Sequence, residues 1–408
     1  MIVKKNFLIF IISLVFLRFV LLFPFRLCAY SRFLNPLPIL FVCVLVFTHF
    51  KKIKIDRIKI MFLILNFLVI FITAVQISSN ISFWLVLLPR LSSVLYVMVF
   101  PLALLLLDWK SEDYLFVIRK LCYVMIWVGG SVAIINSILI YGFKISTFTI
   151  ICWGFPIDLV KSYGSSYKFD GQIRMLGFLF NLEHSQLAVA SATVFLLSEY
   201  LLNKKSCHKN LFITVIFGMI TFPFYSSIIV NIVGYSTLLL CIYLFSQRRT
   251  KIITTIFFPF ILTLSMYVNH ISWGKLDYYL RKWQYFVSLF IPNFSGCYTK
   301  NFFWAPFRDA GYNGMCSFSE IHSLSYIPEF GLIPMLPWLL VLFSPLYFFS
   351  QYKKLPRSVL PSLLMMICYL GGAIHYSGVE NWGNNYVFLL GLLSILTISL
   401  NKKKLSDQ

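Results

Sequence analysis

Charge is scarce in this chain, and negative charge is the scarcest. Only 12% of the 408 residues are charged, with 14 Asp and Glu against 35 Lys and Arg. A soluble domain has about a quarter of its residues charged and about half apolar, whereas 59% of this chain is apolar. Too little polar sequence is present to cover two or three soluble domains. The composition excludes soluble enzymes, nucleic-acid-binding proteins and disordered chains, and it predicts an integral membrane protein.

Sequence motifs for metal, nucleotide and nucleophile chemistry are also missing. The nine cysteines show no CxxC or Cys/His spacing, and no Walker, Rossmann, HExxH or GxSxG motif occurs. We therefore expect no metal site and no cofactor. Most cysteines lie in apolar runs, where a thiol behaves as a small hydrophobic group. Cys297 and Cys316 share one long loop and are candidates for a disulfide in an oxidising periplasm.

Long apolar runs are abundant and continuous. Each approaches the ~20 residues that cross a bilayer as a helix, without the period-two alternation of a membrane β-barrel. The candidate spans are residues 3–25, 34–50, 60–78, 83–107, 121–143, 176–202, 211–224, 228–245, 252–271, 329–350, 358–376 and 386–400. We expect the first run to be a retained span and not a cleaved signal peptide. The seventh and eighth runs are short, and a re-entrant pair is the alternative for them.

The fold class expected from these runs is all-α, as one polytopic transmembrane domain of about 12 helices over residues 1–408. Two long loops interrupt it, at about 144–175 and 272–328. Most of the Lys and Arg residues fall in the connections on one side, whereas the short connections on the other side hold only Arg26 and Arg32. Short basic loops stay in the cytoplasm. We therefore expect both termini in the cytoplasm and both long loops outside, and the net charge of +21 reflects topology.

The first polar cluster lies where the 176–202 run begins. Arg174, Gly177, Asn181 and His184 recur every three or four residues, which places them on one helical face if the helix begins early. The planar fork of an Arg binds phosphate well, and Glu183 is a candidate base or a neutralising partner. The alternative is a snorkelling Arg with a polar patch at the helix start.

The second polar cluster precedes the 329–350 run. His322 titrates near neutrality and is a candidate acid or base. Glu320 and Glu329 lie close to it in the sequence and are candidates to orient it. The alternative is an ordinary polar loop in which Pro328 and Gly331 shape the turn into the helix.

Further basic residues are candidates to bind an anionic substrate. Arg281 and Arg308 lie in the second long loop, where solvated loop charge is the alternative. The aromatic stretch Lys275–Leu289 suits an interfacial helix. Arg90 lies inside the 83–107 run, where it must pair, face water or snorkel; it either bonds a carbonyl freed by Pro89 or lines a cavity. Weaker candidates lie in the last exterior connection: His375, Glu380 and Asn381.

These features together resemble the O-antigen polymerase family (Wzy-type), within the wider O-antigen ligase and polymerase group. The resemblance rests on many hydrophobic helices, two large periplasmic loops, and two motifs. The first motif is Arg174-x-x-Gly177 leading into a helix, and the second is His322 followed by the helix start Gly331-Leu332-Ile333. It implies a glycosyltransferase of the bacterial inner membrane that acts in lipopolysaccharide biosynthesis.

The resemblance implies that the substrate is an oligosaccharide repeat linked to undecaprenyl pyrophosphate. The enzyme is expected to transfer the growing chain onto a new lipid-linked repeat at the periplasmic face. Arg174 is then the first choice to stabilise the leaving diphosphate, assisted by Arg281 and Arg90, and His322 or Glu183 would accept the proton of the attacking hydroxyl. The expected partners are membrane lipid and a chain-length co-polymerase, with no nucleic acid.

Two other functions remain open at this point. An O-antigen ligase, which transfers finished polysaccharide to lipid A-core, has the same topology and similar charge clusters. A flippase for the lipid-linked repeat is often also 12-spanning, but it should carry charges in several span interiors. Charges inside the predicted spans are nearly confined to Arg18 and Arg90, which favours chemistry at the membrane surface.

Overall fold

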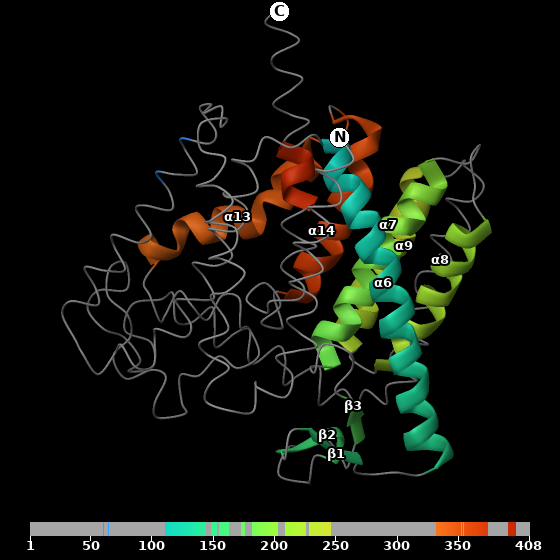
Figure 1. The fold of residues 1–408 in the computed structure, drawn as a ribbon. Coiled ribbons are helices and arrows are strands. Elements are labelled where there is room, and N and C mark those ends of the chain that lie inside the picture. The colour runs from blue at the N-terminus through green and yellow to red at the C-terminus, as the bar shows by residue number, and fades with distance from the viewer. Residues whose placement is uncertain are drawn as a thin grey trace, which may run out of the picture.

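The computed structural model describes part of the chain, shown as ribbon in Figure 1. The described residues are 60, 64, 111–143, 148–152, 155–162, 173–175, 182–202, 209–225, 228–245, 332–351, 353, 355–373 and 391–396. The helices are α6 (Ser111–Ser137), α7 (Leu182–Leu202), α8 (Lys209–Thr221), α9 (Ile228–Phe245), α13 (Leu332–Ser350) and α14 (Leu360–Ala373). Shorter turns are η2 (Ile138–Gly142, a π-helix), η4 (Phe222–Tyr225) and η6 (Arg357–Val359, both 3₁₀).

Helix α6 begins ten residues before the predicted span 121–143, and the predicted start is therefore wrong. Its first turn carries Glu112 and Asp113, which interact favourably with the positive end of the helix dipole. Tyr114, Val117 and Ile118 are fully buried and recur every three or four residues, so the segment packs as one helical face. Part of the stretch expected to be a cytoplasmic connection is thus core.

The other helices follow the predicted runs more closely. The bounds of α9 equal the predicted run 228–245, and α13 begins three residues into the predicted run 329–350. Helix α14 with η6 covers most of 358–376. Residues 391–396 are helical, inside the run 386–400. The helical part of the expected fold class is therefore confirmed for the described core, whereas the runs before residue 111 and at 252–271 lie almost entirely outside the described residues.

Helix α7 is the centre of the described core. It packs against α6, α8, α9 and α14, and these neighbours surround it in Figure 1. Its side chains are buried from Ser185 to Glu199. Close packing is possible because small residues lie at the contacts: Gly218 of α8 abuts Thr193, and Gly372 of α14 abuts Leu187. Small residues that let helix backbones approach are typical of membrane helix interfaces.

The contacts also fix the direction of the helices. The start of α7 meets the end of α14 at Leu187 and Gly372, so these two helices are antiparallel. Helices α7 and α9 are parallel, because Ser198 and Cys241 are hydrogen-bonded near the end of both. One end of the bundle therefore collects the starts of α6, α8 and α14 and the ends of α7 and α9. We name it the basic end, for its exposed cations Arg119, Lys120, Lys209, Lys353 and Arg357.

Two helical segments, Glu112–Ser137 and Ser185–Leu202, are long and apolar enough to cross a membrane. The outer surface of α6 and α8 is apolar, as expected for a lipid-facing surface. Its exposed residues include Val124, Trp127, Val128 and Ile135 of α6, and Phe212, Ile213, Ile216 and Ile220 of α8. Trp127 stacks on Phe217 with ring centroids 4.6 Å apart and joins the two helices.

A small antiparallel sheet lies beyond the end of α6, at the opposite end of the molecule from the basic end (Figure 1). Its strands are β1 (Phe148–Cys152), β2 (Phe155–Ser162) and β3 (Ile173–Met175), in the order β1-β2-β3. Their β-branched and aromatic residues favour strands. The sequence predicted a loop at 144–175 and did not predict that part of it forms a sheet. We name the end of the bundle that adjoins this sheet the sheet end.

Candidate functional site

The register of the sheet contains one irregularity that decides the arrangement of its charges. Phe148 pairs with Val160, but the next residue, Thr149, pairs with Asp158. Leu159 is therefore an extra residue in β2, as in a β-bulge. Residues directly opposite one another lie on the same face of a sheet, so the pairing assigns every paired residue to a face. Across the bulge, Asp158 and Val160 fall on opposite faces.

The assignment yields one apolar face and one charged face. The apolar face holds Phe148, Ile150, Cys152, Phe155, Ile157, Val160, Ile173 and Met175, together with Ser162. The charged face holds Thr149, Ile151, Pro156, Asp158, Lys161 and Arg174. All three charged residues of the paired strands are thus gathered on one face.

Arg174 occupies a position that the sequence did not predict. It lies in β3 directly opposite Lys161 of β2, and α7 begins only at Leu182. The expectation that Arg174 shares a helical face with His184 is therefore wrong. The physical reason is strand pairing: Ile173, Arg174 and Met175 extend the sheet, and they are not available to extend the helix toward its N-terminus. The register brings together two cations, Lys161 and Arg174, and sequence reasoning had singled out only the second.

The start of α7 follows the sheet in the chain. Glu183 and His184 lie in its first turn, at the sheet end. Slightly deeper, Gln186 Nε2 donates a hydrogen bond of 2.7 Å to Asn231 Oδ1 of α9, and both residues are buried. This amide pair fixes α7 against α9 directly below the first turn. Glu183 and His184 therefore open a helix that is closely packed from Ser185 onward.

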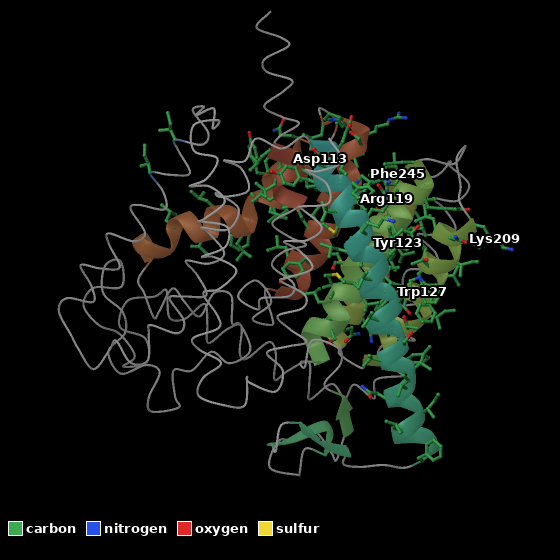
Figure 2. The ribbon with its side chains drawn as sticks, viewed as in Figure 1. Asp113, Arg119, Tyr123, Trp127, Lys209 and Phe245 are labelled. Atoms are coloured by element: carbon green, nitrogen blue, oxygen red, sulfur yellow. The ribbon has the colours of Figure 1, made fainter. Side chains whose placement is uncertain are left out.

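A second charged pair lies near the basic end. Arg119 of α6 donates from Nε and Nη2 to the two carboxylate oxygens of Glu199 in α7, both at 2.7 Å. The side chain of Glu199 is 9% exposed and that of Arg119 is 44% exposed. Figure 2 shows Arg119 on α6 between Asp113 and Tyr123. A two-bonded Arg–carboxylate fork is among the strongest ion-pair geometries, so the pair fixes α6 against α7.

Sequence reasoning missed this ion pair. It treated the span interiors as nearly free of charge apart from Arg18 and Arg90, yet Glu199 is buried in α7. The signal was a single acidic residue near the end of an apolar run, which requires a partner. The partner lies 80 residues away in the chain, in a stretch expected to be a cytoplasmic connection.

The remaining predicted site residues lie outside the part of the chain that the structure describes. They are Arg90, Asn181, Arg281, Arg308, His322 and Glu329, with the weaker candidates His375, Glu380 and Asn381. The loop 272–328 also lies there, including Lys275–Leu289, Cys297 and Cys316. Within the described ranges, no three His, Cys, Asp or Glu residues are close enough together to hold a metal ion.

The residues of the sheet end are of types that could bind an anion and exchange a proton. The register places two cations, Lys161 and Arg174, directly opposite each other, a pattern that suits an anionic ligand. Glu183 and His184 open the next element of the chain and are residue types able to exchange a proton. No family model, no curated protein and no solved structure matches this chain.

Proposed function

We propose that this chain is an O-antigen polymerase, a glycosyltransferase that joins oligosaccharide repeats carried on undecaprenyl pyrophosphate. The reaction takes place at the periplasmic face of a bacterial inner membrane. The single observation that carries the proposal is the position of Arg174. It lies on the charged face of a folded loop beside the start of the central helix α7, away from the basic end.

The distribution of charge supports the orientation. Exposed cations collect at the basic end on Arg119, Lys120, Lys209, Lys353 and Arg357, and Lys and Arg near helix ends mark the cytoplasmic side. The sheet end then faces the periplasm. The apolar outer surface of α6 and α8 supports contact with lipid, and a lipid-linked substrate reaches a surface site by diffusing in the same bilayer.

The chemistry proposed for the site is a displacement at the anomeric carbon. The hydroxyl of the acceptor repeat attacks this carbon, a new glycosidic C–O bond forms, and the bond to the diphosphate oxygen breaks. Undecaprenyl pyrophosphate leaves with the bonding electrons. Arg174 stabilises the charge that develops on the leaving group. His322 or Glu183 accepts the hydroxyl proton, and Arg281, Arg308 and Arg90 hold the substrate.

Diphosphate is a good leaving group, so the proposed reaction requires no metal, nucleotide or other cofactor. The polar residues near the scissile bond have orienting roles: Asn181 and His184 precede or open α7, and Glu329 follows His322 in the chain. A chain-length co-polymerase is the proposed protein partner. Its action on the same enzyme would set how many repeats are joined.

The proposal is tested by complementing a deletion strain and separating its lipopolysaccharide on a gel. We expect the wild-type gene to restore a ladder of repeat lengths, and Arg174→Ala and His322→Ala to leave a single repeat. Membrane levels of an epitope-tagged protein control for folding. Arg357→Ala, at the basic end, is the matched control and should restore the ladder. Full ladders from both site variants would remove the site assignment.

The phenotype of the deletion separates the competing functions. Loss of a polymerase leaves lipopolysaccharide with one repeat, whereas loss of a ligase leaves lipopolysaccharide with none. Loss of a flippase traps the lipid-linked repeat on the cytoplasmic leaflet, where an impermeant sugar-oxidising reagent does not reach it. Either of the last two phenotypes contradicts the polymerase proposal.

A further inference from the structure

We propose that the outer surface of α6 and α8 binds an anionic phospholipid of the membrane leaflet at the basic end. The lipid phosphate lies between Lys120 and Lys209, and the acyl chains lie on the apolar residues beyond them. We name this region the α6–α8 surface. It is at the opposite end of the molecule from the sheet. The inference requires the proposed membrane location and no part of the proposed glycosyl transfer.

Each of the two helices carries an exposed stripe that begins with a lysine. Side chains three or four residues apart lie on one face of a helix. On α6 the exposed residues with this spacing are Lys120, Val124, Trp127 and Ser131. On α8 they are Lys209, Ile213, Ile216 and Ile220. Both stripes therefore change from a cation at the basic end to a mainly apolar surface further along the helix.

Contacts between the two helices place their lysines at a similar height. Trp127 Nε1 of α6 donates a hydrogen bond of 3.2 Å to Thr214 Oγ1 of α8. Lys120 precedes Trp127 by about 10 Å along its helix, and Lys209 precedes Thr214 by about 8 Å, at 1.5 Å per residue. Figure 2 shows Lys209 nearer the basic end than Trp127. Since both helices begin at the basic end, the heights of the two lysines differ by only about 3 Å.

The charge at this end of the α6–α8 surface is positive. Within the described helices, neither Lys120 nor Lys209 forms an ion pair. The neighbouring Arg119 does not add to the free charge, because Glu199 accepts hydrogen bonds from two of its nitrogens. The exposed Glu112 lies about 12 Å before Lys120 along α6. Two lysines without a carboxylate partner complement the negative charge of a phospholipid phosphate.

Side-chain contacts separate a polar rim from an apolar floor. Lys120 Nζ lies 5.8 Å from the ring centroid of Phe116, one turn nearer the basic end, so the ammonium group extends away from the apolar stripe. Trp127 stacks on Phe217 of α8 with ring centroids 4.6 Å apart. The indole N–H of Trp127 is bonded to Thr214, so the exposed part of the indole is apolar. The stacked rings join the two helices beneath the lysines and offer an acyl chain a flat surface to pack on.

The order of the two parts identifies the ligand as a lipid. Val124 and Ile213 each follow the lysine of their helix by one turn, about 6 Å along the axis. A soluble polyanion would match the cations and leave these apolar side chains uncovered. A phospholipid has a phosphate followed by acyl chains in the same order and direction. The α6–α8 surface therefore fits an anionic phospholipid better than a free anion.

The test is native mass spectrometry of the full-length protein purified in detergent. The protein is titrated separately with phosphatidylglycerol and with phosphatidylcholine of the same acyl chains, which differ in net charge. We expect phosphatidylglycerol to bind roughly tenfold or more tightly, because each lysine near a membrane surface strengthens the attraction to anionic lipid about fivefold. Inorganic phosphate in large excess should not displace it, because phosphate lacks acyl chains.

Two double variants separate this site from the general charge of the basic end. Lys120→Gln/Lys209→Gln should bring the affinities for the two lipids within about threefold of each other. Lys353→Gln/Arg357→Gln removes the same charge from other exposed residues of the basic end. It is the matched control and should keep the wild-type preference. The readout is a ratio of two lipids on one protein, so a partly unfolded variant, which loses both, does not imitate the expected result.

Four results would overturn the inference. They are equal affinity of the wild type for both lipids, an unchanged preference in Lys120→Gln/Lys209→Gln, loss of the preference in the control variant, and displacement of phosphatidylglycerol by phosphate. The third would assign the attraction to the whole basic end, and the fourth would make the ligand a free anion. None of these results bears on polymerisation, which the lipopolysaccharide ladder decides separately.

Discussion

The two side chains of the Arg119–Glu199 ion pair differ in their exposure to solvent. The carboxylate of Glu199 is nearly enclosed, whereas almost half of the Arg119 side chain is exposed. A buried charge that loses its partner keeps its full desolvation cost, whereas an exposed charge that loses its partner is solvated by water. The two residues therefore contribute unequally to stability, although they share the same two hydrogen bonds.

This difference in exposure predicts how much each of three substitutions lowers the free energy of unfolding. Arg119→Ala leaves a buried carboxylate without its partner and should lower the free energy of unfolding by about 2 kcal/mol or more. Glu199→Gln should cost less, because the amide oxygen still accepts from Arg119. Arg119→Lys should lie between them, since it keeps the charge and loses the fork. Thermal unfolding of the detergent-solubilised protein gives the order, and an equal effect of Arg119→Ala and Glu199→Gln would contradict it.

At the scale of elements, the close contact between α7 and α8 depends on a glycine, Gly218 of α8. A Cβ placed on Gly218 would overlap Thr193 Oγ1 and lie 3.3 Å from Ile126 Cγ2. Thr193 cannot easily move away, because its hydroxyl donates a 2.7 Å hydrogen bond to the carbonyl of Val189. Gly218 is thus required by close approach of two helices that are themselves held in place.

Gly218→Ala should therefore destabilise the bundle by about 1–3 kcal/mol, the usual cost of overpacking. Gly142→Ala is the matched control, because a Cβ at Gly142 meets only Ile138 Cγ2, at 3.8 Å. Removing the obstructing hydroxyl in the double variant Gly218→Ala/Thr193→Ala should recover much of the loss. Melting temperatures of the wild type, the two single variants and the double variant test this. If the double variant is no more stable than Gly218→Ala, the Thr193 hydroxyl is not the cause of the loss.

Individual elements differ in how far the sequence predicted them. The continuous apolar run 228–245 predicted α9 to the residue, because its hydrophobicity ends sharply on both sides. The spacing of Arg174 and His184 suggested one helical face, but strand pairing, a contact between distant segments, places Arg174 in β3. The partners of Lys161 and Glu199 could not be predicted from spacing, because both pairings depend on tertiary structure. Spacing along one helix therefore did not predict the neighbours of these charged residues.

At the scale of the whole molecule, the basic end and the sheet end should lie on opposite sides of the membrane. We expect an impermeant maleimide to label Thr149→Cys, on the charged face of the sheet, in intact cells and Lys209→Cys only after permeabilisation. Cys122, Cys241 and Cys368 are free thiols buried in the core and can stay. The other six of the nine cysteines, which include Cys297 and Cys316 of the second long loop, are replaced by Ser so that only the introduced thiol is labelled. Labelling in the reverse order would place the sheet in the cytosol and end the proposal of periplasmic chemistry.

The enclosure of α7 also affects how the protein is made. Its polar residues, among them Gln186, Ser191 and Glu199, are covered by neighbours on every side, and one of those neighbours, α14, is synthesised long after α7. In the proposed membrane location, α7 enters the bilayer with part of its polar surface uncovered. A chain truncated before α14 would then leave the polar residues of α7 without one of the neighbours that cover them, so we expect it to fold less stably than the full chain.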